Sequence, residues 1–218
     1  MDKRMLVILS GGMDSGILMY EAINSEYEVE AIGFNYGQRH VTELDYAKRL
    51  CDDIDICFDI VDIQSITPFI GGSALTDDIE VPKGHYEDLS MKATVVPNRN
   101  AIMLSIAFGI AKARGFGFVG AGMHAGDHAV YPDCRPEFVN AFQSMQLVAM
   151  DEPVTLWTPW IGVDKTHIAK RGFALGFPFE ESWSCYEGKL IHCGECGTCV
   201  ERKEAIGGEG NDPTEYYA

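Results

Sequence analysis

Basic residues are scarce in this sequence. Its 218 residues include 17 lysines and arginines against 33 aspartates and glutamates, which gives a formal net charge of −16. No cluster of lysine or arginine stands out along the chain. The average field of such a protein repels nucleic-acid phosphates. We therefore expect small-molecule substrates and no nucleic-acid partner.

Long hydrophobic runs are also lacking. No stretch approaches the roughly 20 apolar residues that a membrane-spanning helix needs. The first residues lead directly into an apolar run typical of a core strand instead of a signal peptide. We expect a cytoplasmic protein with no membrane partner. The length suits one α/β domain with a small appendage and is too short for two full domains.

The number of cysteines in the chain is odd. The chain has seven, so they cannot all pair, and without a secretion signal we expect reduced thiols. Four stand in the pattern C-x7-C-x2-C-x2-C, at Cys185, Cys193, Cys196 and Cys199. Thiolates at this spacing predict one tetrahedral, structural Zn²⁺ ion per chain. An iron–sulfur cluster and two disulfides are the alternatives, and we favour zinc because nothing in the sequence indicates electron transfer.

The pattern of apolar runs and helix-like stretches predicts an α/β protein with a doubly wound, parallel, five-stranded sheet. We expect strands at 5–9, 29–35, 56–63, 116–122 and 154–157, and helices at 16–22, 43–51, 101–111, 137–150 and 165–175. Thr42 and Asp164 are the expected caps of two helices. A ligand should lie beyond the carboxyl ends of the strands. Residues 65–97 lack periodicity and predict a mobile cover over that site, with disorder as the alternative.

No Walker motif is present, but a different glycine turn, Ser10-Gly11-Gly12-Met13-Asp14-Ser15, joins the first strand to the first helix. The free amides and the dipole at the start of that helix favour an anion. Two glycines alone are common in turns. Ser10 and Ser15 add hydroxyl donors for phosphate, and Asp14 adds a carboxylate suited to Mg²⁺ beside a pyrophosphate. The turn therefore predicts a pyrophosphate site.

Further polar candidates follow the later elements. Arg99 opens an apolar helix that must be buried, and it is a better phosphate ligand than Arg39 in the turn after the second strand. The loop 123–136 contains two histidines, for which hydrogen bonding or solvation is favoured over metal ligation. Beyond the cysteines, Arg202 and Lys203 either face the site or form a solvated helix end.

The turn resembles the pyrophosphate-binding loop (PP-loop) of the ATP-pyrophosphatase superfamily. Several motifs in one order extend this to a resemblance to the 7-cyano-7-deazaguanine synthases, from Leu6 through about Arg202. They are SGGMDS, YGQRH, VPNRN, YPDCRPEF, the lysine of DKTHIAKRG, SCY with CGECGTC, and the DPTEY tail. The sequence departs from many members of that family at Asn98, where they have glycine, and at Ala125, where they carry glutamate.

The resemblance implies an ATP-dependent C–N ligase of queuosine-precursor biosynthesis. Such an enzyme converts 7-carboxy-7-deazaguanine and ammonia to the nitrile through an adenylated intermediate, uses ATP with Mg²⁺, holds zinc through the four cysteines, and is commonly a homodimer. The chemistry fits the residues, because a carboxylate becomes a useful electrophile only after its oxygen is made a good leaving group. We expect an ATP-binding α/β domain over residues 1–180 and a four-cysteine zinc segment over 181–218 packed on it.

The resemblance also implies the site residues. The expected ATP-binding residues are Leu9, Ser10, Gly11, Gly12, Met13, Asp14, Ser15, Gly16, Ile17, Leu18 and Met19. The expected catalytic residues are Ser10, Asp14, Ser15, Arg99, Asp127, Asp133 and Lys165. One carboxylate can accept both donors of a guanine-like edge, for which Asp133 is the first choice and Asp127 the second. Hydrogen bonding of Asp133 within its own turn is the structural alternative.

Two other functions remain open at the level of sequence. The first is a PP-loop relative that stops at the amide or adenylates a tRNA base. The second is a non-catalytic, zinc-stabilised nucleotide-sensing regulator. The acidity of the chain counts against a tRNA substrate and favours a small molecule.

Overall fold

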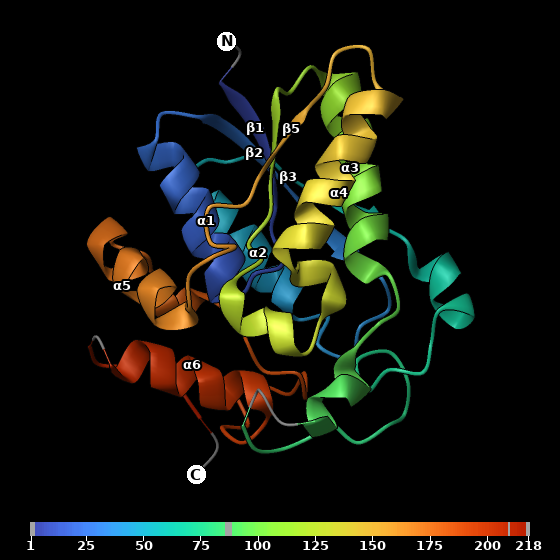
Figure 1. Ribbon diagram of the computed structural model, residues 1–218. Coiled ribbons are helices and arrows are strands. Elements are labelled where there is room, and N and C mark those ends of the chain that lie inside the picture. The colour runs from blue at the N-terminus through green and yellow to red at the C-terminus, as the bar shows by residue number, and fades with distance from the viewer. Residues whose placement is uncertain (1–2, 86–88, 209, 217–218) are drawn as a thin grey trace.

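The computed structural model describes residues 3–85, 89–208 and 210–216 (Figure 1). Its strands form one parallel sheet in the order β3-β2-β1-β4-β5. The strands are β1 Arg4–Ile8, β2 Glu28–Asn35, β3 Phe58–Asp62, β4 Phe118–Gly120 and β5 Thr155–Trp157. The helices are α1 Met13–Asn24, α2 Glu43–Asp52, α3 Arg99–Arg114, α4 Pro136–Ala149, α5 Lys165–Leu175 and α6 Gly197–Gly207. The predicted doubly wound parallel sheet is confirmed.

Both faces of the sheet are covered by helices, which explains why its central strand is apolar after Arg4. In β1, Met5, Leu6 and Val7 are fully buried. Leu6 belongs to a core shared with α3 and α4, whereas Met5 and Val7 belong to a second core with α1, α2 and α5. Figure 1 shows α3 and α4 together on one side of the sheet and α1 and α5 on the other. A strand buried on both faces reads as a continuous hydrophobic run.

The strand order reverses at the centre of the sheet. Successive connections run outward from β1 to β2 and β3, and the chain then crosses from β3 back to β4, on the other side of β1, and on to β5. At such a switch point the loops that leave neighbouring strands diverge, and a crevice opens beyond their carboxyl ends. Here those strands are β1 and β4, so the turn after β1 lies at the place where a ligand is expected.

Local structure follows the sequence, with differences at the ends of elements and at one helix cap. The first helix begins at Met13 instead of residue 16, and the last three strands are shorter than predicted. Thr42 makes no capping hydrogen bond, because its backbone is already helical (φ −54°, ψ −22°) and an N-cap needs an extended one. Asp164 is the predicted cap of α5 and accepts from the amide of His167 at 2.9 Å.

The C-terminal segment packs on the main sheet domain through α6, which contacts α5 (Figure 1). It has a small core of its own, in which Trp183 and Val81 surround three of the clustered cysteines. Arg202 of α6 is fully buried and donates to the carbonyl of Phe179 and to the hydroxyl of Ser182. Neither sequence interpretation of Arg202 is correct, because it fastens α6 to the chain before it.

No helix in the described ranges is long and apolar enough to cross a membrane. Residues 65–97 form two short 3₁₀ segments, Gln64–Phe69 and Leu89–Thr94, joined by irregular chain that includes residues outside the described ranges. Leu75, Met91 and Val96 are nevertheless buried in the core shared with α3 and α4. The described part of this segment is therefore fixed to the domain by apolar contacts.

Candidate active site

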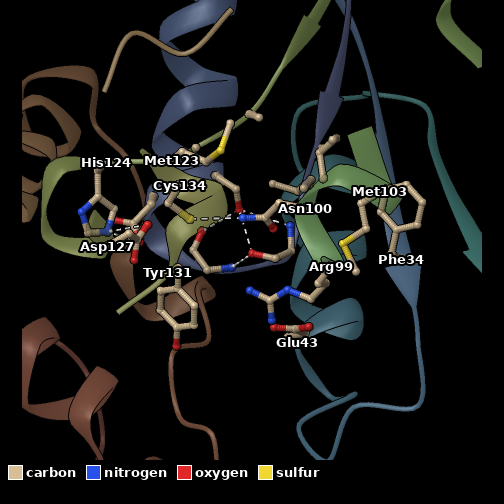
Figure 2. A pocket seen from close by; sticks show the side chains of 18 of the residues that line it. Phe34, Glu43, Arg99, Asn100, Met103, Met123, His124, Asp127, Tyr131 and Cys134 are labelled. Carbon is tan, nitrogen blue, oxygen red and sulfur yellow. Dashed lines mark hydrogen bonds and ion pairs between the residues drawn. The ribbon is translucent and has the colours of Figure 1, made fainter. Parts of the chain in front are cut away.

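A large pocket opens beyond the carboxyl ends of β1, β2 and β4 (Figure 2). It encloses about 1260 Å³ of empty space, including its open mouth. Its walls come from the ends of these strands, from the first turns of α1, α2, α3, α5 and α6, and from residues 183–186. None of the described residues of 65–97 lines it, so the expected cover over the site is not present in the part of that segment the structure describes.

The glycine turn lies on the floor of this pocket and is held by its own serines. The hydroxyls of Ser10 and Ser15 are 3.0 Å apart, Ser15 Oγ accepts from the amide of Ser10, and Ser10 Oγ accepts from the amide of Gly12. Gly11 has φ +86°, and a Cβ there would lie 2.0 Å from the carbonyl oxygen of Glu43. Only glycine permits this close approach of the turn to α2.

Only part of the predicted ATP segment faces the pocket. Leu9, Ser10, Gly12, Asp14 and Ser15 line it. The other predicted ATP-binding residues do not, and they are Gly11, Met13, Gly16, Ile17, Leu18 and Met19. Most of these side chains are fully buried in the core beneath α1, where they hold the helix in place. Their position indicates a supporting role for the second half of the segment.

A buried lysine joins the turn to the C-terminal segment. Lys165, the first residue of α5, lies 3.0 Å from Asp14 Oδ2 and 2.8 Å from Glu201 Oε2 of α6. Burial disfavours the charge of Lys165, but the two carboxylates raise its pKa well above the ordinary value and keep it protonated. Burial also opposes the ionisation of Asp14, yet Lys165 holds the pKa of Asp14 below its usual range. The group is a cation fixed between two carboxylates.

Sequence reasoning missed Glu201. Glu201 lies 36 residues after Lys165 in the chain, and nothing in its local sequence marks it apart from its position two residues after Cys199. Burial raises the pKa of Glu201, although Lys165 opposes this shift.

The loop after β4 contributes His124 and Asp127 to the same end of the pocket (Figure 2). His124 Nδ1 accepts from the amide of Gly126, and Nε2 lies 3.8 Å from Asp14 and 3.6 Å from Asp127. An imidazole that accepts at Nδ1 carries its proton at Nε2 when neutral, so it can donate toward these carboxylates. The predicted preference of His124 for hydrogen bonding fits this arrangement.

Asp14 also leaves one oxygen available. Its Oδ1 atom is buried and has no hydrogen-bond partner among the described residues. A buried carboxylate oxygen without a donor is costly unless a ligand or cation occupies the position. This oxygen, next to the pyrophosphate-type turn, fits Mg²⁺ of a bound nucleotide.

The opposite wall of the pocket carries a second polar group, centred on Arg99 at the start of α3. Arg99 donates to the hydroxyl of Tyr36 at 3.2 Å, and Figure 2 shows its side chain directed toward Glu43. His40 lies 3.4 Å from Glu43 and, like Tyr36 and Glu43, lines the pocket. Tyr36, His40 and Glu43 were not among the sequence candidates, since their polar roles appear only once the turn after β2 meets α3.

The two departures from the family pattern lie outside the pocket lining. Asn98 precedes α3 in the left-handed backbone region, at φ 58° and ψ 19°. Asparagine adopts this region more readily than most other residues with a Cβ, so it suits a position where many relatives have glycine. Ala125 opens the short 3₁₀ turn after β4 and donates its amide to the carbonyl of Val163.

Asp133, the first choice for recognising the base, is not among the residues that line the pocket. Its Oδ2 accepts from the amide of Asn100 at 3.0 Å, and its carbonyl accepts from the Asn100 side chain at 3.2 Å. The carboxylate therefore accepts from an amide at the start of α3 that has no partner within that helix. This amide belongs to a different element from the turn that contains Asp133. This contact supports a structural role close to the one named as the alternative.

Replacing Asp133 with alanine should lower the free energy of unfolding by about 1 kcal/mol, the usual cost of losing a helix cap. The KM values for ATP and for the deazapurine acid should stay nearly unchanged. Denaturant unfolding and steady-state kinetics measure the two effects. If the KM for the acid substrate rose tenfold or more while stability stayed unchanged, Asp133 would have to be assigned to recognition of the base.

The four clustered cysteines converge as a metal site requires. Their sulfur atoms all lie within 4.8 Å of one another, and all four thiols are free of disulfides. The edge of a tetrahedron with metal–sulfur bonds of about 2.3 Å is about 3.8 Å, and Cys193 Sγ lies 3.9 Å from Cys199 Sγ. The amide of Cys193 points at the sulfur of Cys185, and the amide of Cys196 at that of Cys193. The set suits a metal ion with thiolate ligands, as predicted.

Comparison with known proteins identifies a family and relatives that match nearly the whole chain. The family model described as "Queuosine biosynthesis protein QueC" matches residues 4–209. A protein named 7-cyano-7-deazaguanine synthase from Alteromonas mediterranea is 49% identical over 99% of this chain and 100% of its own. One of the same name from Rhizobium etli is 50% identical over 97% of this chain and 91% of its own.

Among solved structures, NMN synthetase from Francisella tularensis resembles the fold. Its TM-score is 0.52 at 16% sequence identity, over 86% of this chain and 68% of that one. This likeness bears on the fold alone, whereas the family match and the curated relatives cover nearly the whole chain. The chain belongs to the QueC family of queuosine biosynthesis proteins.

Proposed function

We propose that the protein converts 7-carboxy-7-deazaguanine, ammonia and ATP to 7-cyano-7-deazaguanine, the product that its relatives' name denotes. The observation that carries this proposal is the placement of Lys165 between Asp14 of the pyrophosphate-type turn and Glu201, at a pocket that Asp14 and Lys165 line together with Arg99. A regulator that only senses nucleotide has no evident use for the second polar wall around Arg99.

The proposed chemistry begins with attack of the substrate carboxylate on the α-phosphate of ATP, which forms an acyl-adenylate and pyrophosphate. The hydroxyls of Ser10 and Ser15 and the free amides of the first turn of α1 would hold the pyrophosphate, and Asp14 would hold Mg²⁺. Lys165 and Arg99 neutralise charge that develops at the phosphates. Ammonia then displaces AMP to give the amide, and activation of the amide oxygen by ATP followed by loss of AMP gives the nitrile.

Asp127 is our proposal for the carboxylate that accepts the two adjacent donors of the guanine-like edge. It lines the pocket, unlike Asp133, and its side chain is 15% exposed. A flat, bidentate contact of this type discriminates strongly against rings that lack either donor.

For the cysteine cluster we propose one structural zinc ion per chain. The four soft ligands and their compact spacing support zinc, and they form a closed set with no position for a substrate. We further propose a cytoplasmic homodimer that does not bind nucleic acid, with an ATP-binding domain over 1–180 and a zinc segment over 181–218. The net charge of −16 supports the absence of a nucleic-acid partner.

The test is a turnover assay of purified protein with ammonium as the only nitrogen source. AMP and pyrophosphate should appear only when the deazapurine acid is present, and the nitrile should accumulate with them. Release of AMP without the acid, or turnover sustained by glutamine and not by ammonium, would contradict the proposed function.

A further inference from the structure

Formation of a nitrile removes every proton from the nitrogen of ammonia. This inference rests on the proposed function. When ammonia attacks the acyl-adenylate, the tetrahedral adduct must lose one N–H proton before AMP departs and the amide forms. After the amide oxygen has attacked a second α-phosphate, two more N–H protons leave as the C–O bond breaks and the C≡N bond forms. A proton acceptor near the reacting carbon would therefore serve both halves of the reaction.

Most carboxylates around the pocket are committed elsewhere. Asp14 and Glu201 are both within 3.0 Å of Lys165, and Asp127 lies 3.6 Å from His124. Asp14 and Glu201 lie on either side of Lys165 at the pyrophosphate-type turn, where positive charge and Mg²⁺ are needed, and Asp127 is the carboxylate proposed above for the guanine-like edge. Among the described residues that line the pocket, Glu43 is the remaining carboxylate, and Figure 2 shows it apart from His124 and Asp127, beside Arg99.

The surroundings of Glu43 hold it in one position. It opens α2, its side chain is only 12% exposed, and its Oε1 atom accepts from Gln38 Nε2 at 2.9 Å. Gln38 is itself fixed, because it donates to the carbonyl of Phe34 and accepts from the amide of Tyr36. The carboxylate is thus aimed by a hydrogen bond from the buried Gln38, and Arg99 lies beside it (Figure 2).

The groups that face Glu43 leave its second oxygen usable. His40 Nε2 lies 3.4 Å from Oε2, and Arg99 and Tyr36 complete the titratable and charged groups known to act on Glu43. Burial, reinforced by Arg99, lowers the pKa of His40 to about 3, so this imidazole is neutral at pH 7. Oε2 can therefore take a proton from a bound substrate without competing with a permanent cation in contact with it.

We propose that Glu43 is the proton acceptor of this site, taking N–H protons first from the tetrahedral ammonia adduct and then from the adenylated amide. In each step the N–H electron pair stays on nitrogen, and the C–O bond to AMP breaks with its electrons on the phosphate oxygen. The proton then passes from Glu43 to solvent before Glu43 accepts the next proton. Arg99, on the neighbouring wall, is placed to meet the negative charge of the departing phosphate.

The protonation behaviour of Glu43 suits this role. Burial raises its pKa to about 7, although the Gln38 hydrogen bond and Arg99 both oppose the shift. A base whose pKa lies near the operating pH is both substantially ionised and strong enough to remove a proton. Because the carboxylate is the active form, the rate of amide-to-nitrile conversion should fall about tenfold per pH unit below about 7.

The decisive experiment separates adenylation from proton removal. Exchange of labelled pyrophosphate into ATP, in the presence of the acid and without ammonia, reports adenylation alone and moves no N–H proton. In Glu43→Gln this exchange should stay close to that of the unaltered protein, while nitrile formation from the amide falls on the order of 100-fold or more. The exposed Asp45 of the same helix turn supplies the control, and Asp45→Asn should change neither rate.

The outcomes are distinct. Loss of exchange together with nitrile formation in Glu43→Gln would assign Glu43 to binding or to support of the glycine turn, and unchanged nitrile formation would exclude it altogether. If Glu43→Gln does not fold, the test uses Glu43→Asp and the pH dependence of nitrile formation. A fall in rate at low pH that is retained but shifted to another pH supports the proposal. A fall at the same pH as in the unaltered protein overturns it. Absence of exchange in the unaltered protein would instead contradict the proposed function.

Discussion

Replacing Lys165 with methionine is expected to lower kcat/KM for ATP on the order of 10³-fold. The ammonium contacts Asp14 and Glu201 at 3.0 and 2.8 Å and is the cation positioned nearest the pyrophosphate-type turn. Without it, developing phosphate charge meets two carboxylates instead of a lysine. Steady-state release of AMP at varied ATP concentration measures the loss.

This variant also leaves Asp14 and Glu201 facing one another, which will lower its melting temperature. The double variant Lys165→Met, Glu201→Gln removes that repulsion, and we expect it to recover stability without recovering activity. Lys170→Met, an exposed position on the same helix, is the matched control and should behave as the unaltered protein. Full activity in the double variant would remove Lys165 from the mechanism.

Replacing Cys196 with serine is expected to release the bound metal and to unfold the C-terminal segment. Structural zinc sites bind with apparent free energies of about 10–16 kcal/mol at neutral pH, so the loss of one ligand should cost much of the stability of α6 and its surroundings. Metal analysis and thermal unfolding measure the two effects. The exposed Cys57 provides the control, because Cys57→Ser leaves the cluster intact.

The same variant should impair ATP use, because Glu201 follows the proposed zinc ligand Cys199 by two positions on α6 and reaches Lys165. Purified unaltered protein should contain one equivalent of zinc. Iron with visible charge-transfer absorption would contradict the zinc assignment, and a Cys196→Ser protein that keeps both its metal and its melting temperature would contradict the proposed site.

The sequence allowed the sheet, the pyrophosphate-type turn and the cysteine cluster to be predicted because each depends on residues close together in the chain. A buried strand, two glycines and a helix start are local features, and C-x2-C-x2-C is a local spacing. The pairing of Lys165 with Glu201 could not be read in this way, since it requires α5 and α6 to pack.

Long-range packing also explains the differences at individual residues. Asp133 lies in the short 3₁₀ turn Pro132–Cys134, and α3 lies beside that turn, where the Asp133 carboxylate accepts from the amide of Asn100. In the sequence, Glu43 is only the first residue of the helix predicted over 43–51. Its burial follows from the contact of Gly11 with the first turn of α2 and from the neighbouring wall around Arg99, neither of which appears in the local pattern.

The most direct test of the central claim, activation of the carboxylate by ATP, is the fate of the substrate's own oxygens. The deazapurine acid is labelled with a heavy isotope of oxygen in both carboxylate positions and converted to nitrile with ammonium, and the AMP formed is analysed by mass spectrometry. The account predicts that both labelled atoms are recovered in AMP, each molecule carrying one. Label found in free phosphate or in water, with unlabelled AMP, would contradict it.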